Sequence, residues 1–210
     1  MYYNFDILNM CYVETKGGEL LIENSMGNLT LIGARPGVGK TKYAVDIAAE
    51  RTNTGQKVIY FCPLKRCDLF REEIEEQTQI NPIALNNLIL NDTAGLSISD
   101  ILGICSNSIG ATVILDELTE FCDSKYKPGV EKVFKTLKSF AKEKGIDVIV
   151  LSDLLSSADN RKNYIPELED VKYSEIITKY IDNAVLLTKP ELYDEFASEK
   201  GIVGRKISLS

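Results

Sequence analysis

Short apolar runs recur along the chain, and most are separated by stretches in which apolar residues follow the spacing of an amphipathic helix. A run that is apolar at every position is typical of a strand covered on both faces, as in parallel sheets. The pattern therefore predicts an α/β fold, in which a mostly parallel twisted sheet carries helices on both faces. The predicted strands are 28–32, 57–61, 87–91, 111–115, 147–151, 184–188 and 205–209.

Several of the intervening helical stretches have recognisable ends. Ser97 precedes one of them and offers an N-cap hydroxyl. In the longest stretch Leu137 and Phe140 share one face with lysines opposite, and Gly145 follows where a C-terminal glycine is favoured. The polar segment 156–172 is expected to be a long surface loop. The predicted helices are 40–53, 68–80, 97–105 and 130–144.

The composition fits one globular domain. With 210 residues, 44% hydrophobic and 26% charged, the chain is placed as a single domain over 1–210, in which 1–26 form a lead-in segment. Its apolar runs are far shorter than the roughly 18 residues that a membrane-spanning helix needs. The first residues lack the basic start and continuous apolar stretch of a secretory signal. We therefore expect a cytoplasmic protein without membrane association.

The absence of histidine narrows the chemistry. Without it, Ser-His-Asp and Cys-His catalysis are excluded, and so are mixed Cys/His zinc sites. The 5 cysteines include no Cys-x-x-Cys pair and are interpreted as reduced thiols. A net charge of −7 argues against the broad basic surface of a strong nucleic-acid binder.

A Gly-rich segment joins the strand 28–32 to the helix that begins at Lys40. It matches the phosphate-binding loop, or Walker A motif, with Ala34 in place of the first glycine. In such a loop small residues let backbone N–H groups approach phosphate oxygens, the lysine reaches the β- and γ-phosphates, and the hydroxyl of Thr41 holds Mg²⁺. An ordinary Gly-rich turn is the simpler alternative. The predicted nucleotide-binding residues are Gly33, Ala34, Arg35, Pro36, Gly37, Val38, Gly39, Lys40 and Thr41.

The strand 111–115 ends in the acidic pair Asp116-Glu117. Ligands of open parallel sheets bind at the carboxyl ends of the strands, so both carboxylates are candidates for the same site. Asp116 would complete the Mg²⁺ shell, and Glu117 would orient or deprotonate the attacking water. Alternatively, the pair simply begins a solvated loop.

An ordered set of segments resembles the RecA-like motor domain at the C-terminal end of DnaB-type replicative helicases. The resemblance covers roughly 20–210, and it implies a RecA-like P-loop fold, ATP and Mg²⁺ as cofactors, and a link to DNA replication. The segments that carry it are 27–41, 88–93, 98–101, 137–143, 148–154, 174–177 and 182–187.

Three positions depart from the pattern of this family. Leu64 stands where the family has a catalytic glutamate, so we assign the base to Glu117. Asp153 replaces the family's glutamine, and it is counted with Lys40 and Glu117 as a candidate catalytic residue. Glu199 occupies the place of an intersubunit arginine finger, which implies slow hydrolysis unless Lys200, Arg205 or a partner substitutes.

These observations favour an ATP-binding and slowly ATP-hydrolysing P-loop protein related to DnaB-type helicases and associated with DNA replication or recombination. Autonomous helicase activity is not expected. The alternative is a nucleotide-dependent binding module, or regulatory partner, that has lost motor activity. Besides the nucleotide, the expected partner is weakly bound single-stranded DNA or a replication protein, and a homo-oligomer is compatible with the resemblance.

Overall fold

The computed structural model describes residues 10–12, 26–78, 80–122, 126–160, 165–189, 192 and 202–209. These residues form an eight-stranded sheet in the order β1-β8-β7-β2-β6-β5-β3-β4. From β7 to β4 all neighbouring strands are parallel, whereas β8 is antiparallel to both β7 and β1. The predicted mostly parallel sheet is therefore confirmed.

The strands are β1 (Met10–Tyr12), β2 (Leu29–Ala34), β3 (Val58–Phe61), β4 (Leu88–Asn91), β5 (Thr112–Leu115), β6 (Asp147–Asp153), β7 (Asn183–Thr188) and β8 (Val203–Ser208). The α-helices are α1 (Lys40–Asn53), α2 (Cys67–Gln77), α3 (Ile98–Cys105), α4 (Lys127–Lys144) and α5 (Ser174–Ile177). Short 3₁₀ helices are η2 (Ala84–Asn87), η3 (Leu118–Glu120), η4 (Ser156–Asn160) and η5 (Leu168–Asp170).

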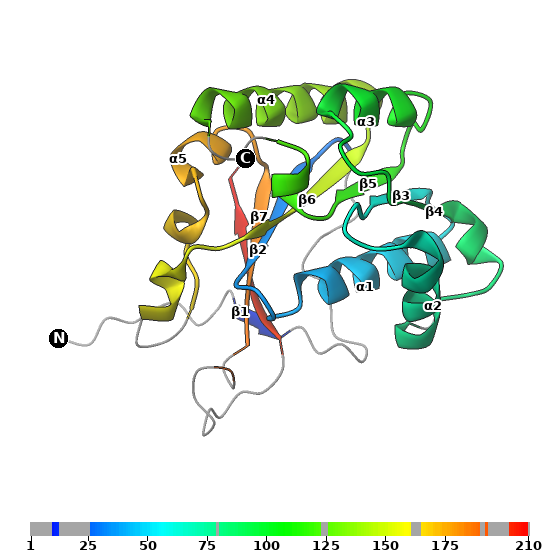
Figure 1. Ribbon diagram of the computed structural model, residues 1–210, viewed down its shortest axis with the longest axis horizontal. Helices are drawn as coiled ribbons and strands as arrows, with labels where there is room; N and C mark the ends of the chain where they lie inside the picture. The colour runs from blue at the N-terminus through cyan, green and yellow to red at the C-terminus, as the bar shows by residue number, and fades with distance from the viewer. Residues whose placement is uncertain are drawn as a thin grey trace.

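Helices cover both faces of the sheet, with α3, α4 and α5 on one side and α1 and α2 on the other (Figure 1). The alternation of side chains along each strand supplies both cores. On β2, Leu29 and Leu31 belong to the cluster under α3, α4 and α5, whereas Ile32 and Ala34 belong to the cluster under α1 and α2. This is why the strands are apolar along their whole length.

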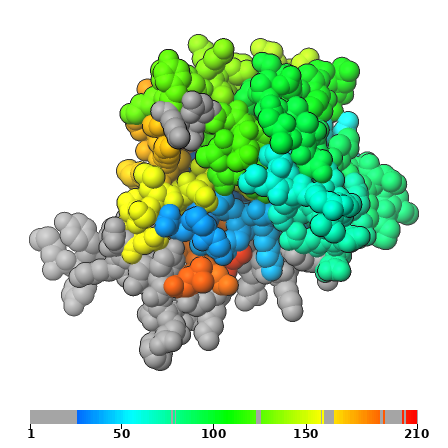
Figure 2. Space-filling model, viewed as in Figure 1, coloured from blue at the N-terminus to red at the C-terminus, as the bar shows by residue number. Residues whose placement is uncertain are grey.

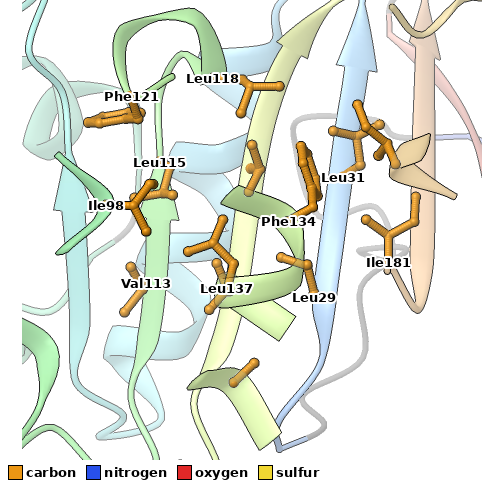
Figure 3. Close-up of a cluster of buried hydrophobic side chains, with 14 of the residues drawn as sticks. Leu29, Leu31, Ile98, Val113, Leu115, Leu118, Phe121, Phe134, Leu137 and Ile181 are labelled. Carbon is orange, nitrogen blue, oxygen red and sulfur yellow. The ribbon is translucent and has the colours of Figure 1, made fainter. Parts of the chain in front are cut away.

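The larger core lies between α4 and the middle of the sheet. Figure 3 shows Phe134 and Leu137 of α4 directed at the strands that carry Leu29, Leu31 and Val113. Phe134 is fully buried and Leu137 nearly so. Truncating a buried aromatic side chain of this kind typically costs about 3–5 kcal/mol of stability, so α4 is firmly fixed to the sheet.

The predicted helix ends have clear structural causes. The hydroxyl of Ser97 accepts the N–H of Asp100, whose carboxylate accepts the N–H of Ser97, so α3 begins with a capping box. Helix α4 ends at Gly145, which adopts the left-handed conformation (φ 58°) that favours glycine.

Two segments differ from the sequence-based expectation. Residues 10–12, predicted as part of a lead-in segment, form the edge strand β1 against β8. The surface loop predicted over 156–172 contains η4 and η5 where it is described. Within the described residues, none of the helices combines the length and the apolar character required to cross a bilayer.

Candidate nucleotide-binding site

The candidate site lies at the carboxyl ends of β2, β5 and β6. Ala34 at the end of β2 pairs with Asp153 at the end of β6, and Leu115 at the end of β5 pairs with Val150. Because β6 continues beyond its neighbour, Asp153 lies beside the residues that follow β5. In Figure 2 the blue surface of the loop after β2 and the start of α1 is exposed in the middle of the view. It is bordered by the yellow segment after β6, the green segment after β5 and the cyan segment after β3.

The conformation of the loop between β2 and α1 depends on its glycines. Gly37 and Gly39 have φ values of 81° and 116°, which other residues rarely adopt. A Cβ on Gly39 would also lie 2.6 Å from Cδ1 of Ile202, whereas a Cβ on Gly37 would meet nothing within 4 Å. Gly33 packs closely in another way, because a Cβ there would lie 2.8 Å from Cδ2 of Leu154.

Arg35 is tied to the segment that follows β6. Its Nε donates to both carboxylate oxygens of Asp159 at 3.1 and 3.0 Å, and its Nη1 donates to the carbonyl of Leu154 at 2.8 Å. The predicted nucleotide-binding residue Arg35 therefore braces the loop against η4. Asp159 was not singled out by the sequence, because its partner lies more than a hundred residues away and no local signal connects them.

Lys40, the first residue of α1, faces two carboxylates. Its ammonium forms a hydrogen-bonded ion pair with Asp153, and it lies 3.7 Å from Oε2 of Glu117. The backbone N–H of Asp153 donates to Oε1 of Glu117 at 3.0 Å. The structure thus brings together the three residues that the sequence nominated as catalytic.

Thr41 and Asp116 form the second polar pair of the site. The Thr41 hydroxyl donates to Oδ2 of Asp116 at 3.0 Å, and the hydroxyl of Tyr60 donates to the same oxygen at 3.0 Å. Burial raises the pKa of Asp116, while both hydroxyl groups lower it. Asp116 therefore does not begin a solvated loop, which was the alternative interpretation.

Tyr60 is the site residue that sequence reasoning missed. It is fully buried on β3 and packs edge-on against Phe70 with ring centroids 5.2 Å apart, so its sequence context indicated only a core position. The one available signal is that a buried tyrosine hydroxyl needs a hydrogen-bond partner, and the carboxylate of Asp116 is that partner.

Burial also shifts the proton affinity of Glu117. It raises the pKa of this carboxyl to about 7; the ammonium of Lys40 opposes the shift, while the carboxylates of Asp153 and Asp116 add to it. A carboxylate with a pKa near neutrality is well matched to accepting a proton from water. By contrast, burial raises the pKa of the Cys62 thiol to about 12, so Cys62 is not a reactive thiolate.

The residues present fit a nucleotide with Mg²⁺. A hydroxyl and a carboxylate held 3.0 Å apart are hard oxygen donors of the kind that Mg²⁺ prefers. In the described part of the chain no group of three His, Cys, Asp or Glu side chains could hold a metal ion alone. A cation beside Thr41 and Asp116 would therefore rely on phosphate and water oxygens, which is the usual arrangement for Mg²⁺ in nucleotide sites.

Not every predicted residue can be assessed. Glu199 and Lys200 lie outside the described residues. Arg205 lies within β8, where it pairs in register with Leu186 of β7 and Met10 of β1.

The strand order and the loop after β2 define a RecA-like P-loop fold. The chain belongs to the family of the DnaB-like helicase C terminal domain, whose model matches residues 63–208. That match begins after the phosphate loop, so the loop itself is characterised by its geometry. The family membership links the chain to replicative helicases and to DNA replication.

Individual relatives are similar at low identity. The replicative DNA helicase DnaC of Bacillus subtilis (strain 168) is 24% identical over 209 residues, covering 84% of this chain and 46% of its own length. A probable replicative DNA helicase of Trieres chinensis is 27% identical over 202 residues, covering 80% and 44%. The chain thus spans less than half the length of these curated relatives.

Two solved structures share the fold. One of them, an isolated ATPase domain, superposes with a TM-score of 0.72 at 20% identity, covering 85% of this chain and 75% of that one. A DnaB-like replicative helicase, solved for its interactions with primase, gives a TM-score of 0.71 at 20% identity and covers 86% and 51%.

Proposed function

We propose that this chain binds ATP with Mg²⁺ at residues 33–41 and hydrolyses it slowly, as a motor-type domain of DNA replication. The observation that carries the proposal is the cluster at the carboxyl ends of β2, β5 and β6, where Lys40 and Thr41 meet Asp116 and Glu117. A cation, a hydroxyl and two carboxylates beside a loop of backbone N–H groups are the components that phosphoryl transfer requires.

Each residue has a role that its surroundings support. The backbone of 33–41 and the ammonium of Lys40 would hold the phosphates, and Thr41 with Asp116 would hold Mg²⁺, which when bound neutralises charge on the phosphates. Tyr60 keeps Asp116 oriented by occupying one carboxylate oxygen. Glu117, held by the N–H of Asp153, would orient water and accept its proton.

Slow turnover is proposed because Lys40 is the residue of this cluster that must serve the phosphates, yet it already faces two carboxylates. The sequence adds Glu199 at the position expected for an arginine finger, a group worth about 10³–10⁵ in rate. We do not expect this chain to unwind DNA by itself. The proposed partners are single-stranded DNA, bound weakly, or a replication protein, and the proposed state leaves room for a homo-oligomer.

Isothermal titration with ATP and Mg²⁺ tests the binding site. Lys40→Ala should abolish ATP binding, because it removes the ammonium that faces the phosphate loop. Lys42→Ala is the matched control: this lysine lies on the same helix but is exposed, and its loss should leave the affinity unchanged. Equal ATP affinity for the wild type and Lys40→Ala would overturn the assignment.

A further inference from the structure

The ion pair between Lys40 and Asp153 has no evident structural task. Asp153 is the last residue of β6, its side chain is 49% exposed, and its carboxylate reaches over the phosphate loop to the Lys40 ammonium. The strand is already fixed without it, because residues of β6 from Val148 to Val150 are buried between β2 and β5. An exposed ion pair at a strand end contributes little to stability.

The same pair does have a consequence for binding. The Lys40 side chain is only 10% exposed, so water reaches its ammonium from few directions and the carboxylates of Asp153 and Glu117 are its main counter-charges. A phosphate entering the loop needs that ammonium. It must displace Asp153, or share the lysine with it at close range, and either arrangement places like charges together or breaks an ion pair.

We propose that Asp153 sets the nucleotide affinity of this site by competing with phosphate for Lys40. This inference rests on the proposed function, since it concerns the same loop. Asp153 acts through the lysine and is a positioning residue. It keeps the lysine neutralised when phosphate is absent and weakens binding in proportion to the phosphate charge that the lysine must hold.

The proposal predicts a gain of affinity, which a merely structural role would not produce. Asp153→Asn keeps the size of the side chain and removes its charge, so ATP·Mg²⁺ should bind about five- to tenfold more tightly in a calorimetric titration. The gain should be smaller for ADP, which presents less phosphate charge to Lys40.

Asp68→Asn is the matched control. It changes the net charge of the chain by the same amount, but Asp68 is exposed on α2 and pairs with Arg66. Tighter ATP binding by Asp153→Asn alone supports the proposal. Equal tightening by both variants would reduce the effect to net charge and overturn it, and so would unchanged or weaker binding by Asp153→Asn.

The outcomes separate the two proposals. If the wild type binds no ATP and Asp153→Asn binds none either, the proposed function fails. If the wild type binds and only the gain is missing, the role of Asp153 fails while the proposed function stands. Should Asp153→Asn not fold, as judged by its thermal melting curve, Asp153→Ser removes the same charge and is expected to show the same gain.

Discussion

Glu117 derives its position from a backbone group on the neighbouring strand. The N–H of Asp153 fixes one carboxylate oxygen at 3.0 Å, and the Lys40 ammonium faces the other at 3.7 Å. A side chain held at both oxygens has little freedom to rotate. It is therefore preorganised beside the phosphate loop, which is the condition for a base that must meet one particular water molecule.

We expect Glu117→Gln to retain ATP binding and to lower the steady-state hydrolysis rate about 100-fold, because the amide keeps the shape and cannot accept the proton. A phosphate-release assay at saturating ATP measures the rate. Glu120→Gln provides the control, since Glu120 lies close by in η3 and is exposed. Wild-type turnover by Glu117→Gln, together with measurable wild-type activity, would show that the base lies elsewhere.

At the scale of whole elements, a buried ion pair ties α1 to the amino ends of β5 and β6. Arg51, in the last turn of α1, donates to Oδ2 of Asp147 at 3.1 Å and to the hydroxyl of Thr112 at 2.5 Å. The other oxygen of Asp147 accepts the N–H of Asn28 at 3.1 Å. The helix that begins in the phosphate loop is thus anchored at its far end as well, at the opposite edge of the sheet.

Arg51→Met should lower the free energy of unfolding by about 3 kcal/mol or more, because it leaves the buried carboxylate of Asp147 without its cation. Burial already raises the pKa of Asp147, and Arg51 lowers it, so the variant raises that pKa further. A folded carboxyl with a raised pKa binds more protons than the unfolded chain, so stability falls as pH rises. The loss should therefore be greater near about pH 8 than near about pH 5.

Urea denaturation at both pH values checks this expectation. Arg66→Met is the comparison, because Arg66 forms an exposed pair with Asp68, and its loss should not change stability measurably. A loss that is the same at both pH values would indicate that Arg51 contributes through packing rather than through charge.

How far the sequence predicts the structure depends on how local each signal is. Continuous apolar runs indicated β2 to β8, and the motif residues Lys40, Thr41, Asp116 and Glu117 were expected at one edge of the sheet, where the structure has them. The strand β1 was missed, because three residues carry too little pattern and their partner β8 lies near the other end of the chain. The contacts of Tyr60 and Asp159 were missed because they join segments that only the folded sheet brings together.

For the molecule as a whole, charge limits what the surface can bind. The net charge is −7, and the exposed lysines of α4, Lys132 and Lys135 among them, are the main basic concentration in the sequence. Helix α4 lies on the face of the sheet opposite to α1 (Figure 1), so phosphate contacts there would leave the phosphate loop accessible. An acidic protein with one small basic strip binds nucleic acid through few phosphates.

Single-stranded DNA should therefore bind weakly and lose affinity steeply with added salt. With about two lysines in contact, the logarithm of the binding constant should fall with the logarithm of salt concentration with a slope near about −1.4, and Lys132→Gln with Lys135→Gln should remove most of that slope. Fluorescence anisotropy of a labelled oligonucleotide across a salt series measures it. Lys42→Gln, which removes an exposed charge on the opposite face, should leave the slope unchanged. Tight binding that persists at high salt would mean that stacking or base contacts dominate, and the electrostatic account of DNA binding would then be wrong.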